Sequence, residues 1–190
     1  ISEWNSKGML FSESDPVFLE NRLPANEDGL TNININQTMS FSDNIIGSES
    51  LVLNVANGKN FSSGQDSISP YALRTVSTAS TDSSPIVDVY RINVNTGATY
   101  NNSANLSVRD TTAPSSSTDG AITIDGGHFN NSGNLIVGNG QGTISVTNNG
   151  HFIQSEHGTL TSTIDGSGNS TKIALANNGT ASLNGTLNIV

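Results

Sequence analysis

The sequence predicts an all-β fold, a parallel β-helix in which short strands stack coil upon coil. Glycine-plus-leucine strand starts recur at intervals of 25 and 27 residues, at Gly133-Asn134-Leu135, Gly158-Thr159-Leu160 and Gly185-Thr186-Leu187. A period of roughly 20 to 30 residues built from short strands is typical of a solenoid. Gly, Asn, Ser and Thr make up 92 of 190 residues and aromatic residues only 5%, which suits a thin core. Gly, Pro and Asn also interrupt every window long enough for an amphipathic helix.

The repeat is clearest in residues 121–190, where apolar residues alternate with polar ones. The alternating pairs are Ile122/Ile124, Leu135/Val137, Ile144/Val146, Ile173/Leu175 and Leu187/Ile189. Each pair points to one face of a strand. Clusters rich in Gly and Asn lie between the strands and supply residues that tolerate positive φ, so they are predicted to be corners.

The same pattern is looser in residues 31–110. Its apolar positions are Ile33/Ile35, Leu51/Leu53/Val55, Ile92/Val94 and Leu106/Val108. Residues 31–190 are therefore predicted to be β-helix coils, with loop insertions at 62–85 and 110–119 that are too long for a corner. Residues 1–30, which hold the single Trp and many acidic residues, are predicted to be an irregular coil or a cap.

β-Hairpins are the competing interpretation, because Asn-Gly between alternating apolar residues is also a strong hairpin signal. Gly127-His128-Phe129 and Gly150-His151-Phe152 recur 23 residues apart, each shortly after a strand. Stacked coils require such a recurrence and a meander does not. The recurrence favours the parallel helix.

Equivalent polar residues on successive coils are expected to form ladders. His128 and His151 should then lie about 5 Å apart. A zinc site would need further ligands, and only Asp125 and Glu156 are near in sequence. The favoured interpretation is therefore that the two histidines are polar residues at an exposed corner. The corners Asn148-Asn149-Gly150 and Asn177-Asn178-Gly179 are candidates for an amide ladder, and their exposed amides could also bind sugars.

Catalytic, metal-binding and cofactor-binding residues are not predicted. Asp125 lacks the second carboxylate that a glycoside hydrolase needs, and Lys172 is the only Lys or Arg in residues 121–190. Gly-x-Ser-x-Gly and phosphate-loop motifs are missing from the sequence. A β-roll calcium motif is approached once, at Asp165-Gly166-Ser167-Gly168-Asn169, and not in tandem.

The net charge of −9 and the pI of about 4.4 argue against binding to nucleic acid or to anionic membrane surfaces. Eight of the sixteen acidic residues lie in the first fifty positions, so the repeat half is nearly uncharged. The chain has no cysteine. This absence has two explanations, chance or export of the unfolded protein through a periplasm, where disulfides would interfere. No stretch is apolar enough to span a membrane as a helix.

Residues 133–150 (Gly-Asn-Leu-Ile-Val-Gly-Asn-Gly-Gln-Gly-Thr-Ile-Ser-Val-Thr-Asn-Asn-Gly), together with Gly158-Thr-Leu and residues 177–190, resemble the passenger repeats of Gram-negative type V autotransporters. The resemblance covers residues 121–190 well and 31–110 loosely. It implies a right-handed parallel β-helix, exported by a C-terminal barrel that this sequence does not include. A start at Ile1 and an end at Val190, inside a strand pattern, are expected of a piece of a longer chain. Residues 1–120 show no sign of the protease domain that some passengers carry.

The resemblance therefore implies a secreted or cell-surface adhesin or aggregation module. Its expected partners are a host extracellular matrix protein, a glycan or a second copy of itself, bound through the solenoid face and its loops. The loop 62–85 is the predicted contact site, with Tyr71, Arg74 and Asp82 as binding residues. Two alternatives stay open: a carbohydrate-active β-helix enzyme or phage tailspike, and a purely structural stalk.

Overall fold

The computed structural model describes residues 31–41, 45–46, 51–64, 86–110, 121–138, 142–164 and 166–190. Within these ranges the chain forms eighteen short strands and no α-helix. The predicted cap at residues 1–30 lies outside the described residues. So do residues 65–85 and 111–119, which make up most of the two predicted insertions.

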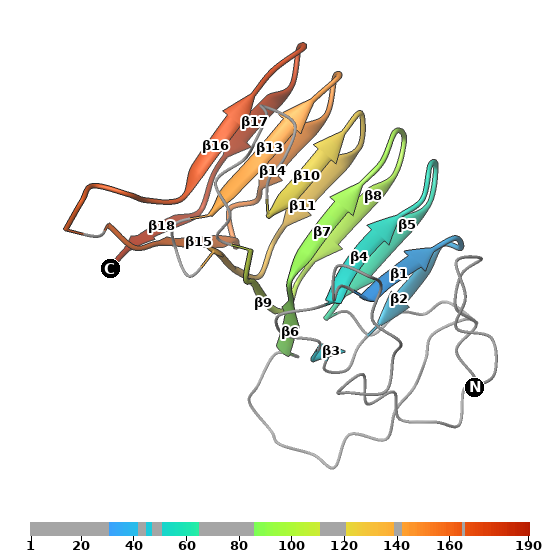
Figure 1. Ribbon diagram of the computed structural model, residues 1–190, viewed down its shortest axis with the longest axis horizontal. Helices are drawn as coiled ribbons and strands as arrows, with labels where there is room; N and C mark the ends of the chain where they lie inside the picture. Colours follow the sequence, from blue (N-terminus) through green and yellow to red (C-terminus); the bar gives the residue numbers. More distant parts are fainter. Residues whose placement is uncertain are drawn as a thin grey trace.

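The strands form three parallel sheets of six strands each (Figure 1). Sheet A consists of β1 (Thr31–Ile35), β4 (Leu51–Val55), β7 (Arg91–Val94), β10 (Ile122–Asp125), β13 (Thr143–Thr147) and β16 (Lys172–Leu175). Sheet B consists of β2 (Met39–Phe41), β5 (Asn60–Ser63), β8 (Thr99–Asn102), β11 (His128–Asn131), β14 (His151–Gln154) and β17 (Thr180–Leu183). Sheet C consists of β3 (Ile45–Ile46), β6 (Ile86–Val89), β9 (Asn105–Val108), β12 (Asn134–Val137), β15 (Thr159–Ser162) and β18 (Thr186–Ile189).

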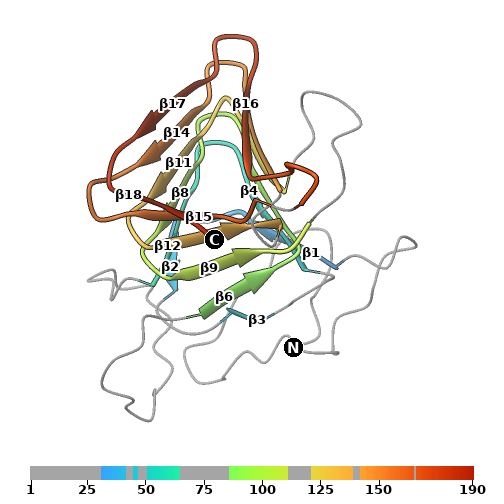
Figure 2. The same cartoon turned by 90° about the vertical axis from the view of Figure 1, so that its left-hand side faces the viewer.

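Each coil contributes one strand to each sheet, and the coils stack in sequence order. Seen along the stack, the three sheets form the sides of a triangle (Figure 2). The glycine-leucine repeat is in register, because Leu135 pairs with Leu160 and Leu160 pairs with Leu187. All the strand pairings are parallel, so the prediction of a parallel β-helix is confirmed and the hairpin alternative is wrong for the described strands.

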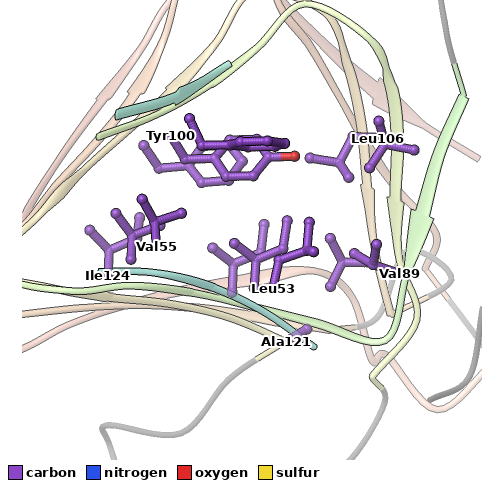
Figure 3. Packing of buried hydrophobic residues seen from close by; sticks show 14 of the residues in the cluster. Leu53, Val55, Val89, Tyr100, Leu106, Ala121 and Ile124 are labelled. Carbon is purple, nitrogen blue, oxygen red and sulfur yellow. The ribbon is translucent and has the colours of Figure 1, made fainter. Parts of the chain in front are cut away.

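Alternating side chains from the three sheets fill a narrow core. The strand pattern of one buried and one more exposed residue repeats in β5 to β9, as expected when one face of each sheet is covered. Figure 3 shows where the sheets meet: Leu53 and Val55 come from sheet A, Tyr100 from sheet B and Leu106 from sheet C. All four are at most 2% exposed.

Sheet B contributes a column of aromatic rings to this core. The ring centroids of Phe61 and Tyr100 are 5.3 Å apart, those of Tyr100 and Phe129 4.9 Å, and those of Phe129 and Phe152 5.8 Å. The Tyr100 hydroxyl donates a hydrogen bond to Ser63 Oγ at 3.2 Å. Burial raises the pKa of the Tyr100 phenol well above its usual range, although the bond to Ser63 opposes this shift.

The corner between sheets A and B turns through residues with positive φ. Gly58, Gly97 and Gly126 fill this role in the middle coils, and the asparagine pairs 148–149 and 177–178 fill it in the last two. Asn177 Nδ2 donates to Asn148 Oδ1 at 3.1 Å, which confirms the predicted amide ladder. Asn148 in turn donates to Asp125 Oδ1 at 2.6 Å, so the ladder ends on a carboxylate.

The corner between sheets B and C holds a second ladder, and this one is buried. Asn102 Nδ2 donates to Asn131 Oδ1 at 2.8 Å, and Asn131 Nδ2 donates to Gln154 Oε1 at 3.4 Å. The same amides bond to the backbone of the corner: Asn102 Oδ1 accepts from Ala104 N at 3.1 Å, and Gln154 Nε2 donates to the carbonyl of Thr186 at 2.9 Å. The buried amides of this corner are therefore paired with one another and with the backbone. Ser155 Oγ, in the same corner of the fifth coil, is buried without a hydrogen-bond partner.

The last coil, β16 to β18, has a neighbouring coil on one side only. Its apolar side chains stand in register with buried residues of the preceding coil, yet they are exposed: Leu175, Leu183, Leu187 and Ile189 are 51–61% accessible. The sequence pattern placed Leu175, Leu187 and Ile189 correctly on the apolar face. Among the described residues there is no helix of the length and hydrophobicity needed to cross a membrane.

Candidate functional site

The predicted contact residues Tyr71, Arg74 and Asp82 lie outside the described residues. On the described part of the chain, the outer faces of the three sheets and the corners between them are the surfaces that could carry a site. In a β-helix, outward side chains of successive coils line up in columns about 4.8 Å apart, because the strands pair in register.

The outer face of sheet B carries two such columns. We call the first the histidine column, which consists of Asn60, Thr99, His128, His151 and Thr180. We call the second the amide column, which consists of Ser40, Ser62, Asn101, Asn130, Ile153 and Ser182. Apart from the histidines, neither column contains an ionisable side chain, and Ile153 is the only large apolar member. The face is therefore an uncharged surface rich in amides and hydroxyls.

Hydrogen bonds along the amide column hold its side chains in one orientation. Asn101 Nδ2 donates to Ser62 Oγ at 3.2 Å, and Asn130 Nδ2 donates to Asn101 Oδ1 at 2.8 Å. A side chain that is already ordered loses less entropy when a ligand binds. The column thus presents pre-oriented donors and acceptors across several coils.

The histidine column contains the predicted ladder of two imidazoles. The ring centroids of His128 and His151 are 4.8 Å apart and the rings are inclined by 19°, which confirms the expected spacing. His151 Nδ1 lies 2.6 Å from Thr180 Oγ1, so Thr180 orients this ring from the next coil. His157 is elsewhere, in the turn after β14, where Nε2 lies 3.3 Å from Glu156 Oε1 and both side chains are 81% exposed.

The outer faces of sheets A and C differ from that of sheet B. On sheet A, the outward residues Val52, Thr143 and Ser145 are at most 7% exposed, so part of this face is covered. On sheet C, Ile86 stands at the start of one outward column and Ile136 lies within the other, and they are 47% and 37% exposed. Sheet A also carries a hydrogen-bonded column of asparagines, Asn34, Asn54 and Asn93, but this column continues into the buried Ser145. Sheet B differs from both in carrying the stacked histidines beside its amide column.

The corner between sheets C and A carries a four-residue charge cluster. Arg109 binds Asp88 through two hydrogen bonds of 2.6 Å, and Arg91 binds Asp110 at 2.9 and 2.5 Å. The Asp110 side chain is 1% exposed. Arg91 thus supplies the partner that the buried Asp110 carboxylate needs within the third coil. The Asp88–Arg109 pair joins the second coil to the third.

The described carboxylates do not form a catalytic pair. Asp88 and Asp110 are engaged by arginines, and Asp125 accepts hydrogen bonds from Thr147 at 3.3 Å and from Asn148. Glu156 stands in an exposed turn beside His157. In the part of the chain that the structure describes, no three His, Asp or Glu side chains gather as a metal site. The expectation that the chain is not an enzyme stays a prediction.

Sequence reasoning missed the columns of sheet B. It found the histidines through the Gly-His-Phe recurrence, but it treated the asparagines mainly as corner residues. The signal that was available is the Asn-Asn pair at 101–102, which recurs 29 residues later at 130–131. In each pair the first residue points outward and the second is buried.

Comparison of the chain with protein-family models, with curated proteins and with solved structures found no match. The resemblance to autotransporter passengers therefore rests on the repeat residues alone. The outer face of sheet B, with its two columns, is the candidate binding surface on the described part of the chain.

Proposed function

We propose that this β-helix is a bacterial cell-surface adhesion module that binds polar ligands through the outer face of sheet B. The observation that carries the proposal is the pair of columns on this face, which repeat amide, hydroxyl and imidazole groups from coil to coil with Ile153 as the one large apolar member. Each contact to such a face is weak, but a ligand with its own repeat makes many contacts at once.

A neutral glycan fits the chemistry of this face best. Sugar hydroxyls both donate and accept hydrogen bonds, and amide and hydroxyl side chains do the same. The columns carry no carboxylate, lysine or arginine, and the chain as a whole carries −9, which disfavours polyanionic ligands. A matrix glycoprotein or a second copy of the chain would meet the same donors and acceptors.

The test is binding to an array of neutral and acidic glycans and matrix proteins, together with aggregation of cells that display the chain. Asn101→Glu and Asn130→Glu place a carboxylate in the amide column and disrupt its ordered hydrogen bonds. We expect binding to fall at least tenfold while the circular dichroism spectrum is unchanged.

Matched controls place the same charge on sheet C, at Ser107→Glu in the third coil and Thr161→Glu in the fifth. These variants should bind as the original chain does. Equal loss in both sets would show that charge anywhere weakens binding and would refute a role for sheet B. A chain that binds nothing on the array and does not aggregate cells would favour the structural stalk.

The loop prediction is tested separately, because Tyr71, Arg74 and Asp82 belong to another part of the chain. Deletion of residues 65–85 should weaken adhesion if the loop contributes contacts, and the coils should remain folded. Unchanged binding after deletion would reject the loop and leave the sheet B proposal intact.

A further inference from the structure

We propose that His128 and His151 form a two-imidazole binding site for a late divalent transition-metal ion such as Cu²⁺ or Zn²⁺. This site is independent of the adhesion proposal, because its ligand is the metal ion alone. Imidazole nitrogen is a strong ligand for these ions, and Cu²⁺ is bound most tightly among them.

The register of β11 and β14 brings the two histidines together. His128 pairs directly with His151, and their ring centroids are 4.8 Å apart. Two nitrogens bound at about 2 Å to one ion lie at most about 4 Å from each other. The two rings stack side by side, so binding one ion requires the side chains to rotate until one nitrogen of each ring faces the ion, and the open sheet face allows this rotation. His128 is exposed and His151 is half-buried, so an ion can reach both.

Thr180 prepares one of the two rings. His151 Nδ1 lies 2.6 Å from Thr180 Oγ1, and in the tautomer whose Nδ1–H donates to this hydroxyl, Nε2 carries the lone pair that a metal ion binds. A hydrogen bond from the second ring nitrogen is what commonly fixes the orientation of a metal-binding histidine. Thr180 is then a positioning residue rather than a ligand.

The surroundings favour a cation. The neighbours in the two columns, Thr99, Thr180, Asn130 and Ile153, carry no charge, and the net charge of the chain is −9. Two protein ligands leave coordination positions for water or for a donor from another molecule. The site is therefore open, unlike a structural zinc site, which closes with four protein ligands.

The experiment titrates Cu²⁺ into the metal-free 190-residue chain at about pH 7.5, followed by calorimetry and electron paramagnetic resonance. We expect one ion per chain, with a resonance pattern of two nitrogen ligands. His128→Asn and His151→Asn should each weaken binding at least tenfold, and both variants keep a polar side chain in the column. Thr180→Val should weaken it to a smaller extent and leave the two-nitrogen pattern in place.

His157→Asn is the matched control, because it removes a histidine from the exposed turn and leaves the pair intact. This variant should bind Cu²⁺ as the original chain does. Retained binding in the double variant H128N/H151N, a loss in H157N, or a resonance pattern with one nitrogen would each overturn the proposal. Circular dichroism of each variant distinguishes loss of the site from loss of the fold.

Discussion

At the scale of single residues, buried amides stabilise turns that in many other proteins depend on glycine and proline. Asn102 is 1% exposed, and its side chain bonds both to the next coil and to the backbone two residues on. Asn101 is its neighbour in sequence and also bonds to the coils on either side, but it points outward. The two positions therefore separate the effect of burial from the effect of hydrogen bonding.

We predict that Asn102→Ala lowers the free energy of unfolding by about 2 kcal/mol, because Ser63, Ala104 and Asn131 lose a buried partner. Asn101→Ala should cost about 0.5 kcal/mol or less, since water replaces the lost partner at the surface. Urea unfolding of both variants measures the difference. Equal costs would mean that the buried ladder adds nothing beyond the exposed one.

Tyr100 gives a prediction about pH. Burial raises the pKa of its phenol, so the folded chain holds this proton more tightly than the unfolded chain does. The resulting stability is fully present below about pH 10, the pKa of an unfolded tyrosine, and is lost as the pH rises above it, by up to about 1.4 kcal/mol per pH unit. Tyr100→Phe should flatten this alkaline fall in stability. An unchanged slope would contradict the burial of the ionisable hydroxyl.

At the scale of elements, the corners decide which residues the chain can use. The carbonyl of Ala104 lies 2.3 Å from where a Cβ on Gly133 would be, so the backbone of the preceding coil occupies that space. Gly166, in contrast, has no atom within 4 Å of such a Cβ and does not have a positive φ. The coils can therefore stack at this corner only if residue 133 has no side chain.

We predict that Gly133→Ala destabilises the fold by about 1–3 kcal/mol through overpacking against the third coil. Gly166→Ala should be neutral or slightly stabilising, because alanine restricts the unfolded chain more than glycine does. Thermal unfolding of the two variants gives the comparison. A loss of stability in Gly166→Ala as large as that in Gly133→Ala would argue against close stacking at this corner.

The elements also show what the sequence could predict. The strands of sheet A were found because each carries two or more apolar residues on one face, as in Ile122/Ile124 of β10. The four middle strands of sheet B were not assigned, because their second inward position holds Ser63, Asn102, Asn131 or Gln154 instead of an aliphatic residue. Alternation of hydrophobicity cannot reveal a strand whose buried residue is an amide that bonds within a ladder. The outward columns stayed hidden with them.

At the scale of the whole molecule, the stacking of coils places residues far apart in sequence into columns. Five successive strand pairings connect Ser40 in the first coil to Ser182 in the last, through Ser62, Asn101, Asn130 and Ile153. The proposed adhesion surface and the proposed metal site both depend on this register. A slip of one residue would exchange the outward and inward side chains of a strand.

The most direct test is the distance between spin labels at Ser40→Cys and Ser182→Cys, measured by pulsed electron paramagnetic resonance. The chain has no cysteine of its own, so labelling is specific. Five steps of about 4.8 Å predict a separation of about 24 Å between the two backbone positions, broadened by the label arms. A sequential antiparallel meander would put β2 and β17 fifteen strands apart, at about 70 Å. A narrow distribution near 24 Å is the predicted result, and a distribution centred beyond about 50 Å would contradict the stacked coils.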